Sequence, residues 1–593
     1  MTAPSVSIRP RSRWLVPDSP APDVVEGLRA ELNLSEVACR LLAIRGHVAG
    51  EQARKYLRPR LEHIEEGGLL DLDVAVERLV TAARRGETVM VHGDYDVDGM
   101  TSTTILVRTL ESIGARPVPF IPRRATDGYD LTGAGVEAAK TMGATLVVTC
   151  DCGTSAIAPV ADLRAAGIDV IIIDHHLPTG ETARPNALLN PKRAGCPSRD
   201  KDLCAAGVVY KLALCLMRAA GGNVNLVYGM LDLVALATIA DIAPLRGENR
   251  VLARYGLKIL NDSPCLGLRA LIRSAGLEGK PITAGRVGFV IAPRLNAVGR
   301  LGHALRGVEL LMAKDEHTAN TIARELEEMN VRRQEIDRQT LVQARERVLE
   351  MDLESTYGIV VAEQGWHAGV IGIVASRIVE EFGRPAVLIA LDGDEGKGSG
   401  RSISPFDLHA GLTACGDLLR RYGGHRSAAG VTIATDRVAD FARRFNEVAA
   451  SRLTADDLMP EIRVDLEMPL AEANDKLEYV FRHLEPCGMG NPSPVLMVRG
   501  ARVVGAPRVV GKDGLKIVLQ QGDEAITAVG WGLAPRRDEL RESEAYDVAF
   551  KLERDEYRGI SRLQARLIDF RPSRTERSEG EMLSLAPLGT TAG

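Results

Sequence analysis

The 593-residue sequence lacks the features that mark secreted and membrane proteins. No cationic segment followed by an apolar core stands at its N-terminus, so we expect no signal peptide. Its most apolar stretch is interrupted by Asp232 and Asp241, which argues against a membrane-spanning helix. These absences favour a soluble, cytoplasmic protein.

The cysteines also lack the arrangement of a disulfide framework or a zinc site. There are nine, an odd number, and no ligand spacing is repeated among them. Cys150 and Cys152 flank Asp151, but such a short group is not a zinc site. Reduced thiols in a reducing compartment fit this pattern better than disulfides.

Excess positive charge is missing as well, since the formal net charge is −5. Any affinity for nucleic acid must therefore come from local basic patches and from metal ions that neutralise phosphate. No internal repeat is evident. With 45% apolar residues, the chain is long enough for three or four globular domains.

The most informative segment that is present runs from His92 to Gly99. It places one imidazole and three carboxylates, Asp94, Asp96 and Asp98, directly after the apolar run Val89–Val91. Three neighbouring carboxylates repel one another unless protons or metal ions neutralise them. Oxygen and imidazole ligands suit divalent ions such as Mn²⁺ or Mg²⁺. A solvated acidic turn is the alternative.

The same arrangement recurs at two further apolar runs. Leu146–Val148 leads into Asp151, and Val170–Ile173 leads into Asp174, His175 and His176. Because ligand sites in open parallel sheets form beyond the carboxyl ends of the strands, we expect these residues to converge on one crevice. Read alone, the histidine pair could instead be a buried structural pair.

Helical spacing between these runs predicts the fold. Thr101–Ile113 and Ser155–Ala166 separate the strands, so the order is strand, helix, strand, helix. This order predicts an α/β domain with a parallel sheet and covering helices. Asp241 closes the apolar stretch Leu233–Ala240 and is either a helix-end residue or another ligand.

Several segments in a fixed order resemble the DHH phosphoesterase superfamily, and within it the single-strand-specific exonucleases. The resemblance covers roughly residues 60 to 570. Each segment is weak alone, but their order is highly specific. The segments are Val91–Gly99, Asp151–Gly153, Asp174–His176, Ala240–Leu245, Arg294–Arg300, Gly365–Val370, Gly398–Ser402 and Gly423–Gly430.

The resemblance implies a catalytic centre with two divalent cations, Mn²⁺ or Mg²⁺, about 3.5–4 Å apart. The ligands it implies first are Asp96, Asp98, Asp151, His175 and Asp241, with Asp151 bridging the ions and His92 completing one shell. Asp94 and Asp174 are either direct ligands or groups that orient the imidazoles and bound water. His176 would face the scissile phosphate as a donor.

It also implies residues that hold the substrate. Arg294, Asn296 and Arg300 would form a phosphate clamp, since guanidinium groups match phosphate oxygens bidentately. Ser399, Arg401, Ser402, Gly424 and His425 would hold the 5′ end of the strand, and the remaining substrate-binding candidates are Arg124, Trp366 and His367. Ordinary surface or glycine-rich turns are the alternative for each. One departure is Asp130, which stands where the family usually has a glycine.

Six regions follow from these patterns. From His317 to Glu350 there is neither glycine nor proline, which predicts a helix about 50 Å long that connects two domains; a coiled-coil partner helix is the alternative. After about Pro460, runs such as Val503-Val504, Val509-Val510, Ile517–Leu519 and Ile526–Val529 predict short strands. The expected regions are an N-terminal extension (1–45), a DHH phosphoesterase domain (46–315), a connecting helix (316–352), a DHHA1 domain (353–455), an OB-fold nucleic-acid-binding domain (456–573) and a disordered tail (574–593).

The last globular region is expected to hold single strands with a basic groove and stacking aromatics. The candidates are Trp531, Arg536, Arg537, Tyr557 and Arg558, each of which could instead be a core aromatic or a solvated charge.

The resemblance implies a metal-dependent exonuclease that degrades single-stranded DNA from the 5′ end, releases 5′ mononucleotides and serves DNA repair and recombination. It also implies contacts with a single-strand-binding protein and a RecQ-type helicase, and we expect a monomer. A DHH hydrolase of short RNA, cyclic dinucleotides or pyrophosphate is one alternative, although such substrates need no strand-binding domain. A scaffold that only binds single strands is the other, although it would have lost ligands.

Overall fold

The computed structural model describes residues 12–124, 126–178, 180–557 and 560–573. The chain divides into two compact units. One unit contains Pro59–Pro460 and Pro486–Pro492, and the other contains the chain up to Arg58, Glu461–Glu485 and the chain from Ser493 onward. No helix among the described residues combines the length and the apolar character needed to cross a bilayer.

The first domain of the larger unit is built on a five-stranded, all-parallel sheet with the order β3-β2-β4-β5-β6. Its strands are β2 (Thr88–Gly93), β3 (Arg116–Phe120), β4 (Leu146–Cys150), β5 (Asp169–Ile173) and β6 (Ala187–Leu189). The apolar runs Val89–Val91, Leu146–Val148 and Val170–Ile173 are therefore confirmed as strands.

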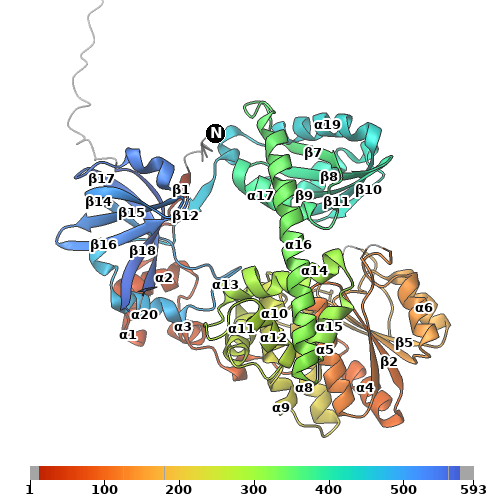
Figure 1. Cartoon of the computed structure of the whole chain (residues 1–593). Coiled ribbons are helices and arrows are strands. Elements are labelled where there is room, and N and C mark those ends of the chain that lie inside the picture. Colours follow the sequence, from red (N-terminus) through yellow and green to blue (C-terminus); the bar gives the residue numbers. More distant parts are fainter. Residues whose placement is uncertain (1–11, 125, 179, 558–559, 574–593) are drawn as a thin grey trace, which may run out of the picture. The chain divides into compact units, whose positions relative to one another are not determined.

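Helices cover both faces of this sheet, which explains why its strands are continuous apolar runs. Val89, Val91 and Val148 share one core with the helices on one face, namely α4 (Leu72–Arg85), α5 (Val97–Ser112) and α8 (Ala205–Ala219). Met90 and Val147 point to the opposite face and pack with α6 (Gly133–Thr141) and α7 (Ile157–Ala165). Figure 1 shows α4 and α6 beside this sheet.

Helices complete the domain beyond the sheet. They are α9 (Asn225–Tyr228), α10 (Leu231–Ala240), α11 (Gly247–Leu260), α12 (Leu266–Ser274), α13 (Ala284–Arg286), a π-helix η2 (Val287–Ile291), α14 (Ala292–Leu301) and α15 (Leu305–Leu311). A single turn, η1 (Leu61–His63), precedes α4. Most of these helices share the core that covers the α5 face of the sheet.

The predicted connecting helix is α16 (Glu316–Leu349), 34 residues without interruption. Asp315 caps it by accepting a hydrogen bond from the Thr318 backbone N–H. Its buried side chains pack on helices of this chain, first on α12 and α14 and later on α17, and Figure 1 shows it running between the two domains. This packing leaves no reason to invoke a coiled-coil partner.

A mixed sheet forms the second domain of the larger unit, with the order β10-β11-β9-β8-β7. Only β7 and β8 are parallel. The elements are β7 (Ile359–Gln364), α17 (Ile371–Phe382), β8 (Ala386–Asp392), β9 (Glu395–Arg401), α18 (Leu408–Thr413), η3 (Gly416–Leu418), β10 (Arg421–Gly424), β11 (Ala428–Ala434), η4 (Thr435–Arg437), α19 (Val438–Ala450) and η5 (Ala455–Leu458). This confirms the predicted α/β character of the segment.

The smaller unit contains a closed barrel with the strand order β13-β14-β15-β16-β18-β17, in which β14 also pairs with β17. Val503-Val504 and Val509-Val510 were predicted as separate strands, but both lie in one strand whose pairing shifts between Val504 and Arg508. The elements are β12 (Glu461–Arg463), β13 (Leu466–Glu467), η6 (Leu470–Glu472), α20 (Asp475–His483), β14 (Leu496–Val510), β15 (Gly514–Gln521), β16 (Glu524–Gly530), η7 (Ala534–Glu539), β17 (Ala545–Tyr557) and β18 (Ile560–Pro572).

The N-terminal segment belongs to the same unit as the barrel. It forms β1 (Arg13–Leu15), α1 (Pro22–Leu32), α2 (Glu36–Ile44) and α3 (Gly50–Leu57). β1 pairs in parallel with β12, some 450 residues later in the chain, as Figure 1 shows. Leu28 and Leu42 are buried in one core with Leu515 and Phe570 of the barrel.

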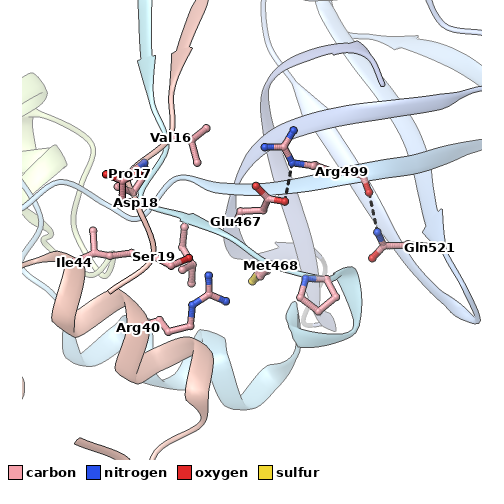
Figure 2. Close-up of a pocket in the computed structure, with 12 residues that line it drawn as sticks. Val16, Pro17, Asp18, Ser19, Arg40, Ile44, Glu467, Met468, Arg499 and Gln521 are labelled. Atoms are coloured by element: carbon pink, nitrogen blue, oxygen red, sulfur yellow. Dashed lines mark hydrogen bonds and ion pairs between the residues drawn. The ribbon is translucent and has the colours of Figure 1, made fainter. Parts of the chain in front are cut away.

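A hollow of about 460 Å³ lies where this segment meets the barrel. Figure 2 shows the Arg40 side chain near Ser19 and Met468. Arg499 forms an ion pair with Glu467 at 2.7 Å on the barrel side. The hollow therefore combines elements from the two ends of the chain. The expected disordered tail (574–593) lies outside the described residues.

Candidate metal centre

The turn after β2 carries the first carboxylates of the site. Asp96 caps helix α5 by accepting a hydrogen bond from the Gly99 N–H at 3.1 Å. Asp98 is buried and accepts hydrogen bonds from the Ala205 and Ala206 N–H groups at 2.7 and 2.8 Å. Both carboxylates are thus fixed by backbone amides before any ligand binds.

Close backbone contact forces a glycine at position 99 of this turn. A Cβ atom there would lie 2.5 Å from the backbone nitrogen of Asp94. No flexible side chain could move to relieve that overlap, because the contact is with backbone. Gly99 therefore keeps Asp94 and the start of α5 close together.

The turn after β4 presents Asp151 from an unusual backbone conformation. Asp151 has φ of 68°, which is uncommon for a residue other than glycine. Gly153 follows with φ of 108°. The turn therefore directs the buried Asp151 carboxylate toward the site at the cost of some backbone strain.

Carboxylates from three different elements lie around the His175 imidazole. Its Nε2 atom lies 3.1 Å from Asp151 Oδ1, 3.7 Å from Asp98 Oδ2 and 3.7 Å from Asp241 Oδ2. Asp241 is the C-terminal cap of α10, and its carboxylate lies near the other candidate ligands. Residues from the ends of β2, β4, β5 and α10 thus meet at one point, as the parallel sheet predicted.

Three overlapping groups have ligand atoms close enough together to hold a cation. In each group these atoms all lie within 4.8 Å of one another. The groups are Asp98, His175 and Asp241; Asp94, Asp96 and Asp151; and Asp151, His175 and His176. Because the first two groups share no residue and the third joins them, the geometry suits two cations with Asp151 between them.

Unpartnered buried oxygens support this fit. Asp94 Oδ1 and Asp151 Oδ1 are buried and accept no hydrogen bond from any described residue. The short approach of His175 to Asp151 does not have the angles of a hydrogen bond. Buried acceptors without donors are costly, and a divalent cation satisfies them.

The electrostatics of the cluster point the same way. Burial and the neighbouring Asp96 raise the pKa of Asp98 to about 6. Burial, Asp98 and Asp96 raise the pKa of Asp241 to about 8. Burial lowers the pKa of His175 to about 3, which keeps its imidazole neutral and able to coordinate a metal. The cluster therefore favours either protons or cations over bare carboxylates.

His176 is held differently from His175. Its Nδ1 atom lies 2.7 Å from Asp174 Oδ1. Burial would lower the pKa of His176, but the hydrogen bond and charge of Asp174 outweigh burial and raise it to about 9. Asp174 also accepts hydrogen bonds from the Thr154, His175 and His176 N–H groups, so it acts here as an orienting group.

His92 lies outside the three groups of possible ligands. Its Nδ1 atom is 3.5 Å from Cys152 Sγ, and its Nε2 atom is buried without a hydrogen-bond partner among the described residues. Burial lowers the pKa of His92 to about 4, so the ring is neutral. Nothing in the residue pattern indicated that a cysteine would contact this histidine.

A loop with two more residues borders the site. Tyr129 Oη lies 3.1 Å from His176 Nε2, a contact that sequence reasoning missed. The neighbouring Asp130 has φ of 73°, a backbone conformation that glycine adopts without strain. This left-handed conformation explains why a glycine was expected at position 130. Asp130 adopts the same conformation.

Guanidinium groups from several elements lie close to one another. Arg300 is partly buried and donates a hydrogen bond to the Gly369 carbonyl at 2.8 Å. Burial and the charges of Arg124, Arg333 and Arg401 lower the pKa of Arg300 to about 10. Arg124 is exposed and lies 5.0 Å from the centre of the Tyr95 ring. Clustered cations with few carboxylate partners are suited to an anion.

Two of the other predicted substrate residues have structural partners. Arg294 forms an ion pair with Glu327 and donates to the Val290 carbonyl. Asn296 accepts a hydrogen bond from the Val97 N–H at 3.2 Å and so supports the start of α5. Neither side chain is free to form a phosphate clamp without giving up these contacts.

Trp366 and His367 precede helix α17. Trp366 is buried and donates its indole N–H to Gln343 at 2.8 Å. The exposed His367 accepts a hydrogen bond from the Gly369 N–H through Nδ1 at 3.0 Å. Trp366 is therefore part of the core between α16 and α17, and only His367 is available to a substrate.

The remaining candidates lie on β9, β10 and the turns that follow. Arg401 donates to Ser399 Oγ at 3.1 Å, and Ser402 donates to the Phe406 carbonyl at 2.8 Å. Gly424 has φ of 139°, and a Cβ there would lie 2.5 Å from the Ala428 carbonyl oxygen. His425 is exposed. Ser399 and Arg401 thus form a polar pair. Gly424, in contrast, is required by the backbone conformation and by the close approach of Ala428.

Among the barrel candidates, Trp531 is exposed and open to a ligand, whereas the exposed Arg537 forms an ion pair with Asp538 at 3.2 Å. Arg536 pairs with Glu539 and Asp569 and lies over the Phe570 ring, so its charge is already neutralised. The Tyr557 side chain and Arg558 lie outside what the structure describes.

Comparison with known proteins gives three matching family models. They are the DHH family, N-terminal domain, at residues 88–238; the DHHA1 domain at residues 355–451; and the RecJ OB domain at residues 464–569. Together they span the parallel-sheet domain, the mixed-sheet domain and the barrel.

Relatives along the whole chain agree with these models. The single-stranded-DNA-specific exonuclease RecJ of Salmonella typhimurium is 33% identical over 557 residues, covering 90% of this chain and 95% of the relative. The exonuclease of the same name from Bacillus subtilis is 36% identical over 526 residues, covering 88% of this chain but only 66% of the relative.

Solved structures match as well. The crystal structure of RecJ from Thermus thermophilus in complex with Mn²⁺ has a TM-score of 0.82 and 31% identity, covering 95% of this chain and 80% of the other. The Mg²⁺ complex of the same protein has a TM-score of 0.77 and 30% identity, with coverages of 95% and 79%.

Proposed function

The chain belongs to the RecJ family of single-stranded-DNA-specific exonucleases, and from that premise we propose how its centre acts. It is a metal-dependent nuclease of DNA repair and recombination, with Mn²⁺ or Mg²⁺ as cofactor. We propose that it removes nucleotides from the 5′ end and releases 5′ mononucleotides.

The observation that carries the proposal is a pair of ligand groups that share no residue and are joined through Asp151 and His175. One group offers Asp98, His175 and Asp241, and the other offers Asp94 and Asp96 together with Asp151. Divalent cations bound there would lower the pKa of a water molecule and stabilise charge on the attacking and leaving oxygens. No protein side chain is then needed as a dedicated general base.

The residues of the chain supply orientation and a proton donor. Asp174 holds His176 through Nδ1. The Nε2 atom can then donate to a phosphate oxygen once that oxygen replaces the Tyr129 hydroxyl. Because Asp174 raises the pKa of His176 to about 9, the ring carries a proton on both nitrogens at neutral pH. Asp98, fixed by two backbone amides, needs no reorganisation when a cation binds.

The basic residues support the proposed direction of cleavage. Ser399 and Arg401 form a polar pair, and Arg300 and Arg124 add positive charge near them. A terminal phosphate would relieve the mutual repulsion of these guanidinium groups. We therefore assign them to the 5′ end of the strand.

The test is a degradation assay on single strands labelled at either end. We expect Mn²⁺-dependent loss of 5′ nucleotides, no activity with EDTA and slow cleavage of blunt duplex. Ordered release from the 3′ end, or activity that survives the chelator, contradicts the proposal. Turnover of only a cyclic or linear dinucleotide would favour the small-substrate alternative, and binding without cleavage would favour the scaffold.

The partners remain part of the proposal. We propose that a single-strand-binding protein presents the strand and that a RecQ-type helicase supplies unwound ends, with the exonuclease acting as a monomer in the cytoplasm. Co-purification of the full chain with each partner, and light scattering of the free chain, test these points.

A further inference from the structure

A second basic feature lies beside the metal centre, at the far edge of the parallel sheet. A cavity of about 630 Å³ opens where β6 ends, next to the residues that follow His176. Three cationic side chains line it: Arg184, Lys192 and Arg193. Leu177, the residue after His176, lines it as well.

Two of these three cations already form ion pairs. Arg193 pairs with Asp71 at 2.7 Å and also donates to the Leu188 carbonyl. Arg184 pairs with Glu181 at 3.0 Å. Lys192, in contrast, forms no ion pair with any carboxylate of the described residues. It is therefore the cation of this cavity that is available to a ligand.

The backbone position of Lys192 is tied to the catalytic loop. Its N–H donates to Asn190 Oδ1 at 2.8 Å. The buried Asn190 amide in turn donates to the His176 carbonyl at 2.9 Å and to Thr154 Oγ1 at 3.1 Å. One rigid asparagine thus links the lysine to the histidine that faces the scissile phosphate.

The Lys192 ammonium also lies near the charged groups of the metal centre. Burial lowers the pKa of His175, and the Lys192 ammonium lowers it further. Burial and nearby carboxylates raise the pKa of Asp241, and Lys192 opposes that rise. The ammonium group therefore lies within electrostatic reach of two candidate metal ligands without pairing with either.

We propose that Lys192 binds the first phosphodiester on the 3′ side of the scissile bond, with its ammonium in the cavity beside β6. This subsite rests on the proposed 5′ exonuclease activity. An enzyme that removes the first nucleotide has only the terminal phosphate on the 5′ side of the scissile bond, and Ser399 and Arg401 are assigned to it. Any further phosphate that Lys192 contacts is therefore on the 3′ side. A lysine on a flexible stem suits this contact, which needs charge but no bidentate geometry.

The test removes the charge either from Lys192 or from one phosphate of the DNA strand. Wild-type protein and Lys192→Ala are given single strands with one neutral methylphosphonate at the second, third or fourth linkage from a phosphorylated 5′ end. We expect the neutral second linkage to lower kcat/KM of the wild type about 10-fold, as loss of one charge-assisted contact does. Lys192→Ala should lose about 10-fold on natural DNA and less than about twofold more with the neutral second linkage.

Two further variants test whether the charge of Lys192 is responsible for the effect. Lys192→Arg keeps the charge and should retain most activity on natural DNA. Lys140→Ala removes an exposed lysine of the same domain and should behave as the wild type. In addition, the dependence of log Kd on log salt for a single strand should become shallower by about 0.7 in Lys192→Ala, the value for one phosphate contact.

The outcomes separate this inference from the activity itself. If Lys192→Ala loses as much as the wild type from the neutral second linkage, the subsite is overturned. It is overturned also if Lys192→Ala loses the thermal stabilisation given by Mn²⁺, because the lysine would then serve the metal ligands. If the wild type degrades no single strand, the proposed function fails instead.

Discussion

The phenol oxygen of Tyr129 lies 3.1 Å from Nε2 of His176. Because Asp174 binds the opposite nitrogen of the same ring, the imidazole is held between a carboxylate and a phenol. Tyr129 is half exposed, so a phosphate oxygen can replace it as the acceptor. We therefore expect the Tyr129 hydroxyl to affect the rate of cleavage.

Replacing Tyr129 with phenylalanine should lower kcat about 3- to 10-fold, because the imidazole loses one of the two contacts that orient it. KM should change less, and the melting temperature should stay within about 1 °C, since the ring still packs against Tyr95. Steady-state kinetics and thermal unfolding check this. Tyr479→Phe, an exposed tyrosine of the barrel unit, is the matched control. Equal kinetics for the two variants would contradict the role of the phenol.

Asp151→Asn should reduce cleavage by on the order of 1000-fold, because the residue between the two ligand groups loses its charge. Binding of a single strand should stay within about threefold of the wild type, since DNA contacts are made mainly by other residues. Single-turnover cleavage and fluorescence anisotropy measure the two quantities. Asp162→Asn, an exposed residue of the same domain, should leave both unchanged. Full activity in Asp151→Asn would remove this residue from the centre.

Stability of the metal-free protein should fall as the pH rises from about 4 to 8. Folding raises the pKa of Asp98 to about 6 and of Asp241 to about 8, chiefly through burial. A carboxyl with a raised pKa binds its proton more tightly in the folded state, so its contribution to stability is complete below the ordinary pKa of 3.8 and is lost by the time the pH reaches the folded value, about 6 for Asp98 and about 8 for Asp241. We expect the melting temperature in EDTA to drop by roughly 3–6 °C over this interval.

Adding Mn²⁺ should reverse that loss, because the cation replaces the protons. The gain in melting temperature from Mn²⁺ should be larger at pH 8.5 than at pH 5.5. In Asp241→Asn the loss of stability with pH should be smaller, since one titrating carboxyl is gone. A melting temperature in EDTA that does not change between pH 6 and 8.5 would contradict the raised pKa values.

Arg401→Ala should abolish the preference for a 5′-phosphorylated strand over one with a 5′ hydroxyl. We expect the wild type to prefer the phosphorylated strand about 10-fold in kcat/KM, because guanidinium groups bind a terminal phosphate with charge-assisted hydrogen bonds. Arg420→Ala, an exposed arginine of the same domain, should retain the preference. If Arg401→Ala keeps it, the 5′ end is held elsewhere.

Much of the fold could be predicted because parallel strands that are buried on both faces have continuous apolar sequences. Val89–Val91 and Val170–Ile173 are covered on both faces, so every position is apolar and the acids that follow stand out. The meeting of Asp98, Asp151 and His175 then follows from the parallel order of strands alone.

The choice of partners could not be predicted in this way. Arg294 has the chemistry of a phosphate ligand but meets Glu327, and Trp366 meets Gln343, because helix α16 brings those acceptors close. Residue type limits what a side chain can bind, whereas tertiary packing decides what it does bind. The contacts of Tyr129 with His176 and of Cys152 with His92 escaped notice for the same reason.

The shared core of the N-terminal helices and the barrel has a consequence for biosynthesis. Leu28 and Leu42 share one core with Phe570, which leaves the ribosome more than 500 residues after them. At ordinary rates of translation, of roughly 5–20 residues per second, that interval lasts roughly 25–100 s. During it the nuclease domains are complete while the first helices still expose an apolar face. Nascent chains should therefore gain a folded catalytic region before their barrel, and should depend on chaperones at their N-terminal end in the meantime.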